Sequence, residues 1–104
     1  MPVVYKITYL NKKIYVGCDM TDSVAYFGSP NSKSIEQDFT PEERRNFTAR
    51  KEILWESPTP TIAELLQRER ELILENRSND PSVGYNRSPR FKAQQRSVRT
   101  PVSG

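Results

Sequence analysis

One glutamate interrupts the apolar stripe of an expected helix. From Thr61 to Ser78 the apolar residues recur at spacings of three and four, which predicts an amphipathic helix. Position 69, seven residues after Ile62 and three before Leu72, belongs to that stripe, yet it is Glu69. Burying a lone carboxylate costs several kcal/mol unless a partner compensates it. A divalent ion is one such partner, because Mg²⁺ typically takes one or two carboxylates and completes its shell with water and substrate phosphate.

Other partners for Glu69 are open at this point. Its carboxylate could turn to water at the edge of the stripe, or it could pair with Arg50 or Lys51. The tyrosines of the first segment, taken singly, are equally typical of ordinary sheet packing.

The composition restricts the chemistry. The chain of 104 residues has no histidine and a single cysteine, Cys18. This excludes a Ser-His-Asp triad, a His-Cys zinc site and a histidine base. The remaining groups can still hydrolyse a phosphodiester: a tyrosine binds or deprotonates water, an arginine clamps phosphate oxygens, and a carboxylate-bound metal stabilises developing charge.

The charge is concentrated near the end of the sequence. The net charge is +3, and from position 87 onward there are five basic residues and no acid, which leaves −2 for residues 1–86. We interpret residues 88–104 as a basic, disordered tail, and we expect nucleic acid as its partner. A purely solubilising tail is the alternative. The candidate nucleic-acid-binding residues are Lys33, Arg87, Arg90 and Lys92.

The elements that must position these residues form one small domain, residues 1–87. Residues 3–17 predict two strands around a turn, residues 31–39 a helical turn or two, and residues 49–57 a third strand. Two capping boxes, Thr40 with Glu43 and Thr61 with Glu64, predict helix starts. The expected fold class is α/β: a small three-stranded antiparallel sheet flanked by helices, in the order β-β-α-(α)-β-α.

The hairpin carries a geometric condition. Tyr5 and Tyr15 point to one face of the sheet only if paired residues have the same parity. That requires an odd loop, such as Asn11-Lys12-Lys13, or a bulge.

Four short matches, in order, resemble the GIY-YIG nuclease family. They are Tyr5 in "VVY", Tyr15 and Gly17 in "YVG", Glu69 in "ERELI" and Asn86 in "GYN". The resemblance implies that Glu69 binds the catalytic metal, Mg²⁺ or Mn²⁺, and that the two tyrosines position and activate water. It also implies that Gly17 and Asn86 support the site structurally.

The sequence departs from this family in two places. Val3 stands where the first glycine of the name motif falls, and no arginine lies about ten residues after the second tyrosine. Arg50, or else Arg45, is therefore the candidate for stabilising the phosphate. The family also often carries a His, Tyr or Lys side chain on the helix between the hairpin and the third strand. The candidates for that position here are Tyr26 and Lys33.

These observations lead to one expected function and one alternative. We expect a metal-dependent endonuclease that acts on DNA rather than RNA, with specificity supplied by a homodimer or a partner protein. The alternative is a non-catalytic nucleic-acid-binding module on the same fold. The first residues lack the pattern of a signal peptide and no apolar run is long enough for a membrane helix, so a cytoplasmic location without membrane contact is expected.

Overall fold

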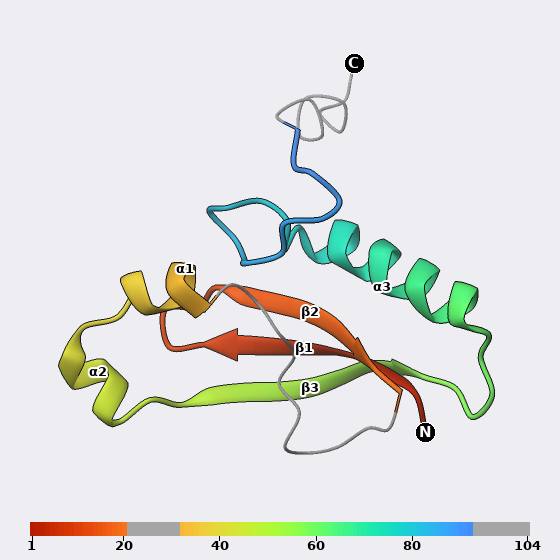
Figure 1. Cartoon of the computed structure of the whole chain (residues 1–104), viewed down its shortest axis with the longest axis horizontal. Helices are drawn as coiled ribbons and strands as arrows, with labels where there is room; N and C mark the ends of the chain where they lie inside the picture. Colours follow the sequence, from red (N-terminus) through yellow and green to blue (C-terminus); the bar gives the residue numbers. More distant parts are fainter. Residues whose placement is uncertain (21–31, 93–104) are drawn as a thin grey trace.

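Three strands pair into one antiparallel sheet in the order β2-β1-β3. The structure is a computed structural model, and it describes residues 1–20 and 32–92. Its elements are β1 (Val3–Tyr9), β2 (Ile14–Asp19), α1 (Ser32–Gln37), α2 (Pro41–Arg45), β3 (Ala49–Glu56) and α3 (Ile62–Asn76). The expected small three-stranded antiparallel sheet with helices is confirmed (Figure 1).

The hairpin loop is odd, as the shared face of the tyrosines requires. Tyr5 pairs with Gly17 and Ile7 pairs with Tyr15, so paired residues share parity. The loop lies one residue earlier than the example chosen from the sequence: it closes between Tyr9 and Lys13, where the Tyr9 N–H donates to the Lys13 carbonyl at 2.9 Å. The loop has the same length of three residues, and its last residue, Lys12, has a left-handed φ of 75° that lets the chain turn back.

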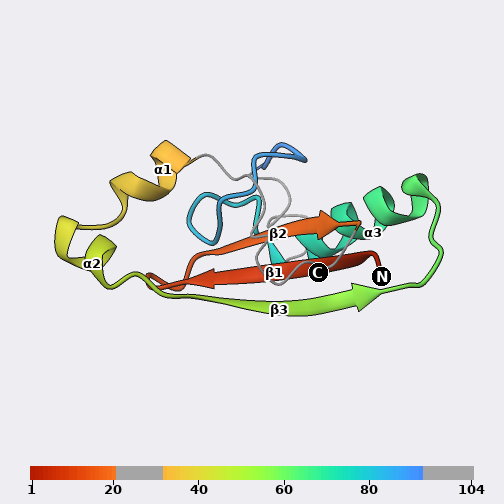
Figure 2. The ribbon, with the colours of Figure 1, turned by 60° about the horizontal axis from the view of Figure 1, so that its bottom comes forward.

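The central strand β1 is buried on both faces. Figures 1 and 2 show α3 along one face of the sheet, whereas α1 and α2 lie at the hairpin end. The face away from α3 carries the cluster Val3, Tyr5, Ile7, Tyr9 and Phe39. The face under α3 carries the cluster Val4, Val16, Leu65 and Ile73. Alternation along β1 therefore divides a small core into two layers.

Both predicted capping boxes are confirmed at the helix starts. In α3 the Glu64 backbone N–H donates to the Thr61 hydroxyl at 3.0 Å, and the Thr61 N–H donates to the Glu64 carboxylate at 2.8 Å. In α2 the corresponding pair is Thr40 and Glu43. These local bonds fix where α3 begins, and hence which of its side chains face the sheet.

Strand β3 contains one irregularity that sets the faces of its side chains. Tyr5 pairs with Ile53, but the next pair toward the start of β1 is Val4 with Trp55, so Leu54 is the extra residue of a bulge. The bulge brings both Leu54 and Trp55 to the cluster under α3.

Candidate functional site

Gly17 lets two tyrosine rings lie close to the strand. A Cβ at position 17 would lie 2.5 Å from the Tyr5 Oη and 3.0 Å from the Tyr15 Cε2, which is too close for any side chain. Tyr5 is buried, with 1% of its surface exposed, whereas Tyr15 is half-buried. The tyrosine of β2 is therefore the one that meets the surface, and the tyrosine of β1 packs behind it.

The Glu69 side chain contacts Cys18 at the outer edge of β2. Its half-buried carboxylate accepts hydrogen bonds from the thiol and the backbone N–H of Cys18. Burial raises the pKa of the Glu69 carboxyl, and these two hydrogen bonds offset part of the rise. Burial, and then the neighbouring carboxylate, raise the pKa of the Cys18 thiol to about 11. Among the described residues, the hydrogen-bond partner of Glu69 is thus Cys18 and not Arg50 or Lys51.

Asn86 completes the same edge of the sheet. Its amide accepts from the Val16 N–H at 2.8 Å and donates to the Val16 carbonyl at 2.8 Å. Two residues earlier on β2, the Ile14 N–H donates to the Val83 carbonyl and the Tyr85 N–H donates to the Ile14 carbonyl. The segment after α3 is therefore held against β2, and this fixes the distance between that segment and Glu69.

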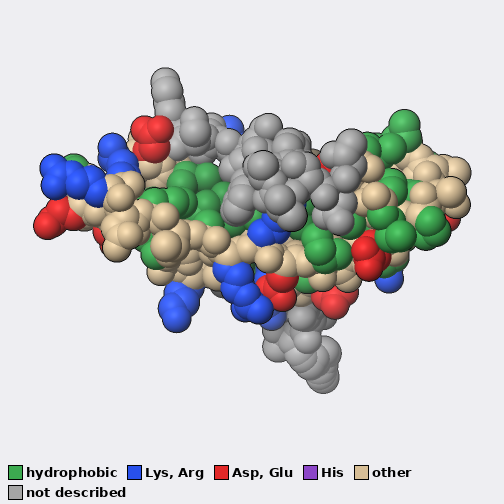
Figure 3. Space-filling view, turned by 90° about the horizontal axis from the view of Figure 1, so that it is seen from below, with side chains coloured by type: hydrophobic (Ala, Val, Ile, Leu, Met, Phe, Trp, Pro, Cys, Tyr) green, Lys and Arg blue, Asp and Glu red, His purple; other side chains and the backbone are tan. Residues whose placement is uncertain are grey.

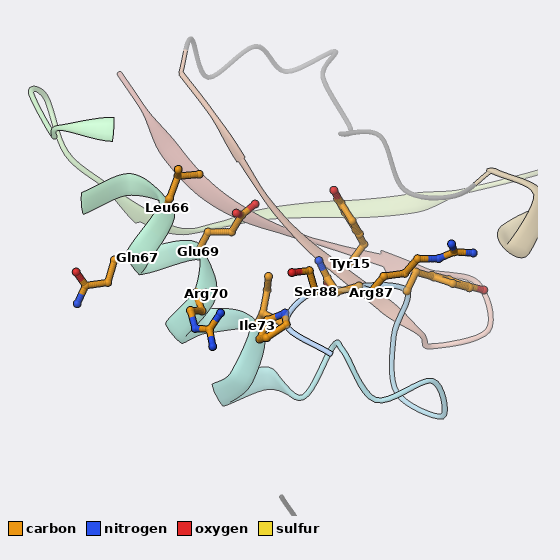
Figure 4. A pocket seen from close by; sticks show the side chains of 11 residues that line it. Tyr15, Leu66, Gln67, Glu69, Arg70, Ile73, Arg87 and Ser88 are labelled. Carbon is orange, nitrogen blue, oxygen red and sulfur yellow. The ribbon is translucent and has the colours of Figure 1, made fainter. Parts of the chain in front are cut away.

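A pocket of about 610 Å³ lies where β2, α3 and this segment meet (Figure 4). It brings together four of the residues selected from the sequence, namely Tyr15, Glu69, Asn86 and Arg87. In Figure 4 the Tyr15 and Glu69 side chains extend in the same direction, and Arg87 extends to the side of Tyr15 opposite Glu69. The pocket thus holds a phenol, a carboxylate and a guanidinium.

The two arginines expected to serve the phosphate do not reach this pocket. Arg50 pairs with Thr8 near the hairpin end of the sheet, and it is not among the residues that line the pocket. Arg45 is exposed on α2, at the hairpin end. Neither candidate arginine therefore lines the pocket, and the position of Arg50 depends on a β3 register that local patterns do not specify.

The same register places beside Tyr5 a cation that was not among the site residues selected from the sequence. Lys51 pairs with Ile7, on the face of the tyrosines, and its Nζ lies 4.8 Å from the centroid of the Tyr5 ring. The alternation of Arg50 and Lys51 was visible in the sequence, but choosing between them required the pairing partner.

The other basic candidates are spread along the chain. Arg90 and Lys92 are exposed and line neither of the two pockets that contain Arg87. Lys33 lies in α1, but its side chain falls outside what the structure describes, and so does Tyr26. Figure 3 shows basic and acidic side chains interspersed on the face seen there, both at the α2 end and near the middle. The described charged side chains visible on that face are therefore mixed in sign.

The site fits a metal ion anchored by one carboxylate, not an enclosed metal centre. Among residues 1–20 and 32–92, no group of three or more His, Cys, Asp or Glu side chains could hold an ion. A carboxylate has about four lone-pair sites, and Cys18 occupies two of those on Glu69. Glu69 lines a pocket large enough for the waters and phosphate that complete a Mg²⁺ shell.

Comparison with known proteins gives no relative. The sequence matches no protein-family model, and neither a curated protein nor a solved structure is significantly similar to it. No helix in the described part of the chain has the length and apolar character needed to cross a membrane.

Proposed function

We propose that this protein is a metal-dependent nuclease of the GIY-YIG type, which hydrolyses phosphodiester bonds in DNA. One observation carries the proposal: Tyr15 and Glu69, from two different elements, line one pocket, and Tyr5 packs behind Tyr15 on Gly17. Burying a carboxylate is costly. Packing alone therefore does not explain why a half-buried carboxylate lies beside the phenol of Tyr15.

We assign the roles of Tyr15, Tyr5 and Glu69 from how far each side chain is exposed. The Tyr15 side chain orients the attacking water and, as the phenolate formed when its own proton is lost to solvent, takes up the proton of that water. The buried Tyr5 ring holds Tyr15 in place. Glu69, oriented by Cys18, holds the ion. A bound Mg²⁺ or Mn²⁺ supplies the positive charge that stabilises the phosphate as the bond breaks.

Metal binding can be tested without activity. We expect Mg²⁺ or Mn²⁺ to raise the unfolding temperature of the wild type and of Glu71→Gln, and to leave that of Glu69→Gln unchanged. Glu71 is a matched control because it lies on the same helix, with an exposed carboxylate that accepts from Arg68 at 2.8 Å. An equal metal effect on all three proteins would remove Glu69 as the anchor.

The role of Tyr15 is tested by cleavage of labelled DNA. We expect Tyr15→Phe to lower kcat by about 10²-fold or more, because general-base catalysis typically contributes 10²–10⁴-fold. Tyr9→Phe is the control, since its ring lies on the same face but packs against Tyr85. A Tyr15→Phe protein with wild-type kcat would contradict the assignment.

A second function is favoured by the state of Glu69. Its carboxylate already accepts two hydrogen bonds from Cys18, and neither Arg50 nor Arg45 lines the pocket. A non-catalytic nucleic-acid-binding module on the same fold has those properties. It would bind DNA in a salt-sensitive way and without any dependence on metal.

The same proposal bears on how the protein would gain sequence specificity and on where in the cell it would act. A domain this small reads few bases alone, so a homodimer or a partner protein would supply sequence specificity. We place the activity in the cytoplasm, where Cys18 stays reduced.

A further inference from the structure

A second pocket continues the first along the edge of β2. It has a volume of about 300 Å³ and shares Tyr85, Asn86 and Arg87 with the first pocket. On its far side it is lined by Lys13 and Gln37, from the hairpin and α1. The two pockets are thus consecutive hollows, which we call the edge groove, and the segment 85–87 forms their common wall.

Arg87 is the charged residue common to both hollows. It is exposed and forms no ion pair with a described residue. Lys13, by contrast, lies 3.4 Å from Asp38, whose carboxylate also accepts from the Tyr85 hydroxyl at 2.6 Å. The guanidinium of Arg87 is therefore the cation in the common wall that remains available to an anion.

The common wall also carries a fixed aromatic ring. Tyr85 packs edge-on against Tyr9, with centroids 5.3 Å apart, and its hydroxyl bonds to Asp38 and Asn11. Burial and the Asp38 hydrogen bond raise the pKa of Tyr85 to about 12, so the ring stays neutral. Tyr15 lies in the first hollow. Cations and aromatic rings that alternate along a groove are typical of proteins that bind single-stranded nucleic acid.

We infer that a single polynucleotide strand occupies the edge groove, with Arg87 binding the phosphate next to the one that faces Glu69. This inference rests on the proposed function for the position of the scissile phosphate. The hollows have the size of small-molecule sites, about 300–1,000 Å³, and accept individual nucleotides rather than a duplex. Arg87 extends to the side of Tyr15 away from Glu69, so its guanidinium would meet a different phosphate from the one that faces Glu69 (Figure 4).

Binding in EDTA tests the inference independently of cleavage. A labelled oligothymidine is titrated with the full chain carrying Arg87→Ala, Arg87→Lys or Arg90→Ala, and a blunt duplex of equal length is titrated in parallel. We expect the wild type to bind the single strand more tightly than the duplex. Arg87→Ala should weaken single-strand binding about tenfold or more, because charge-assisted bonds to phosphate are strong. Arg87→Lys should keep part of the affinity, since it retains the charge but loses the fork.

The Arg90 variant separates a specific contact from general charge. Arg90→Ala removes the same charge three residues further on, outside both hollows, and should cost less than about threefold. Equal losses for Arg87→Ala and Arg90→Ala, or equal affinity for strand and duplex, would overturn the inference. Cleavage that depends on Glu69 would survive that result. Conversely, if the protein never cuts DNA but binds the single strand through Arg87, the proposed nuclease activity is refuted and strand binding in the edge groove is supported.

Discussion

At the scale of single residues, Gly17 determines whether the tyrosines can form a site. We expect Gly17→Ala to lower the free energy of unfolding by about 1–3 kcal/mol, the usual cost of overpacking, because its Cβ would lie 2.5 Å from the Tyr5 Oη. Urea unfolding measures this. Tyr5→Phe in the same protein should restore part of the loss, since it removes the closest atom. A Gly17→Ala protein as stable as the wild type would show that the rings do not pack as described.

Cys18 reports on the contact with Glu69. A thiol whose pKa is raised from an ordinary 9.0 to about 11 has, well below both values, about 100-fold less thiolate. We therefore expect iodoacetamide at pH 8, in EDTA, to alkylate the folded protein about two orders of magnitude more slowly than the urea-unfolded protein. The rate should rise as the pH approaches 11. Glu69→Gln should react faster than the wild type, because the nearby charge and its hydrogen bond are lost, and equal rates would contradict the contact.

At the scale of elements, the outer edge of β2 depends on one side chain. Asn86→Ala leaves the Val16 N–H and carbonyl without their partners, which we expect to cost about 1–3 kcal/mol. Hydrogen exchange at the Val16 amide should accelerate. The exposed Asn46, at the end of α2, is the matched control, and Asn46→Ala should change stability by less than about 0.5 kcal/mol. Unchanged exchange at Val16 in Asn86→Ala would mean that the segment after α3 is held by other contacts.

The elements also show how much the sequence could predict. Both helix starts came from residues three apart, such as Thr61 and Glu64, because a capping box is complete within one turn. The shared face of Tyr5 and Tyr15 needed only the parity of one short loop. The face of Arg50 could not be predicted, since it depends on pairing with Thr8, which lies 42 residues earlier in the sequence. The contact of Glu69 with Cys18 was equally out of reach, because it requires knowing where α3 crosses the sheet.

At the scale of the whole molecule, affinity for nucleic acid should come from two regions, the edge groove and residues 93–104. The net charge of +3 combines five basic residues from Arg87 onward with a balance of −2 in the remainder. Residues 93–104, which lie outside the described part of the chain, contribute Arg96 and Arg99. Their contribution should be non-specific, because contacts to phosphate carry no sequence information.

Salt dependence measures the contribution of these two arginines. On a single strand each neutralised phosphate contributes about 0.7 to the slope of log K against log salt. We expect the double variant Arg96→Gln, Arg99→Gln to lower that slope by up to about 1.4. The double variant Arg44→Gln, Arg45→Gln removes the same charge from α2 and should leave the slope unchanged. The reverse pattern would place the strand at the hairpin end of the molecule.

We propose that Glu69 holds a metal ion for phosphodiester hydrolysis, and one assay tests this role directly. Labelled single- and double-stranded DNA is incubated with the wild type, Glu69→Gln or Glu71→Gln, in Mg²⁺, Mn²⁺ or EDTA. We expect cutting by the wild type and by Glu71→Gln in either metal, none in EDTA, and a loss of at least about 10²-fold in Glu69→Gln. Cutting that persists in Glu69→Gln, or no cutting by the wild type in any metal, would contradict the account.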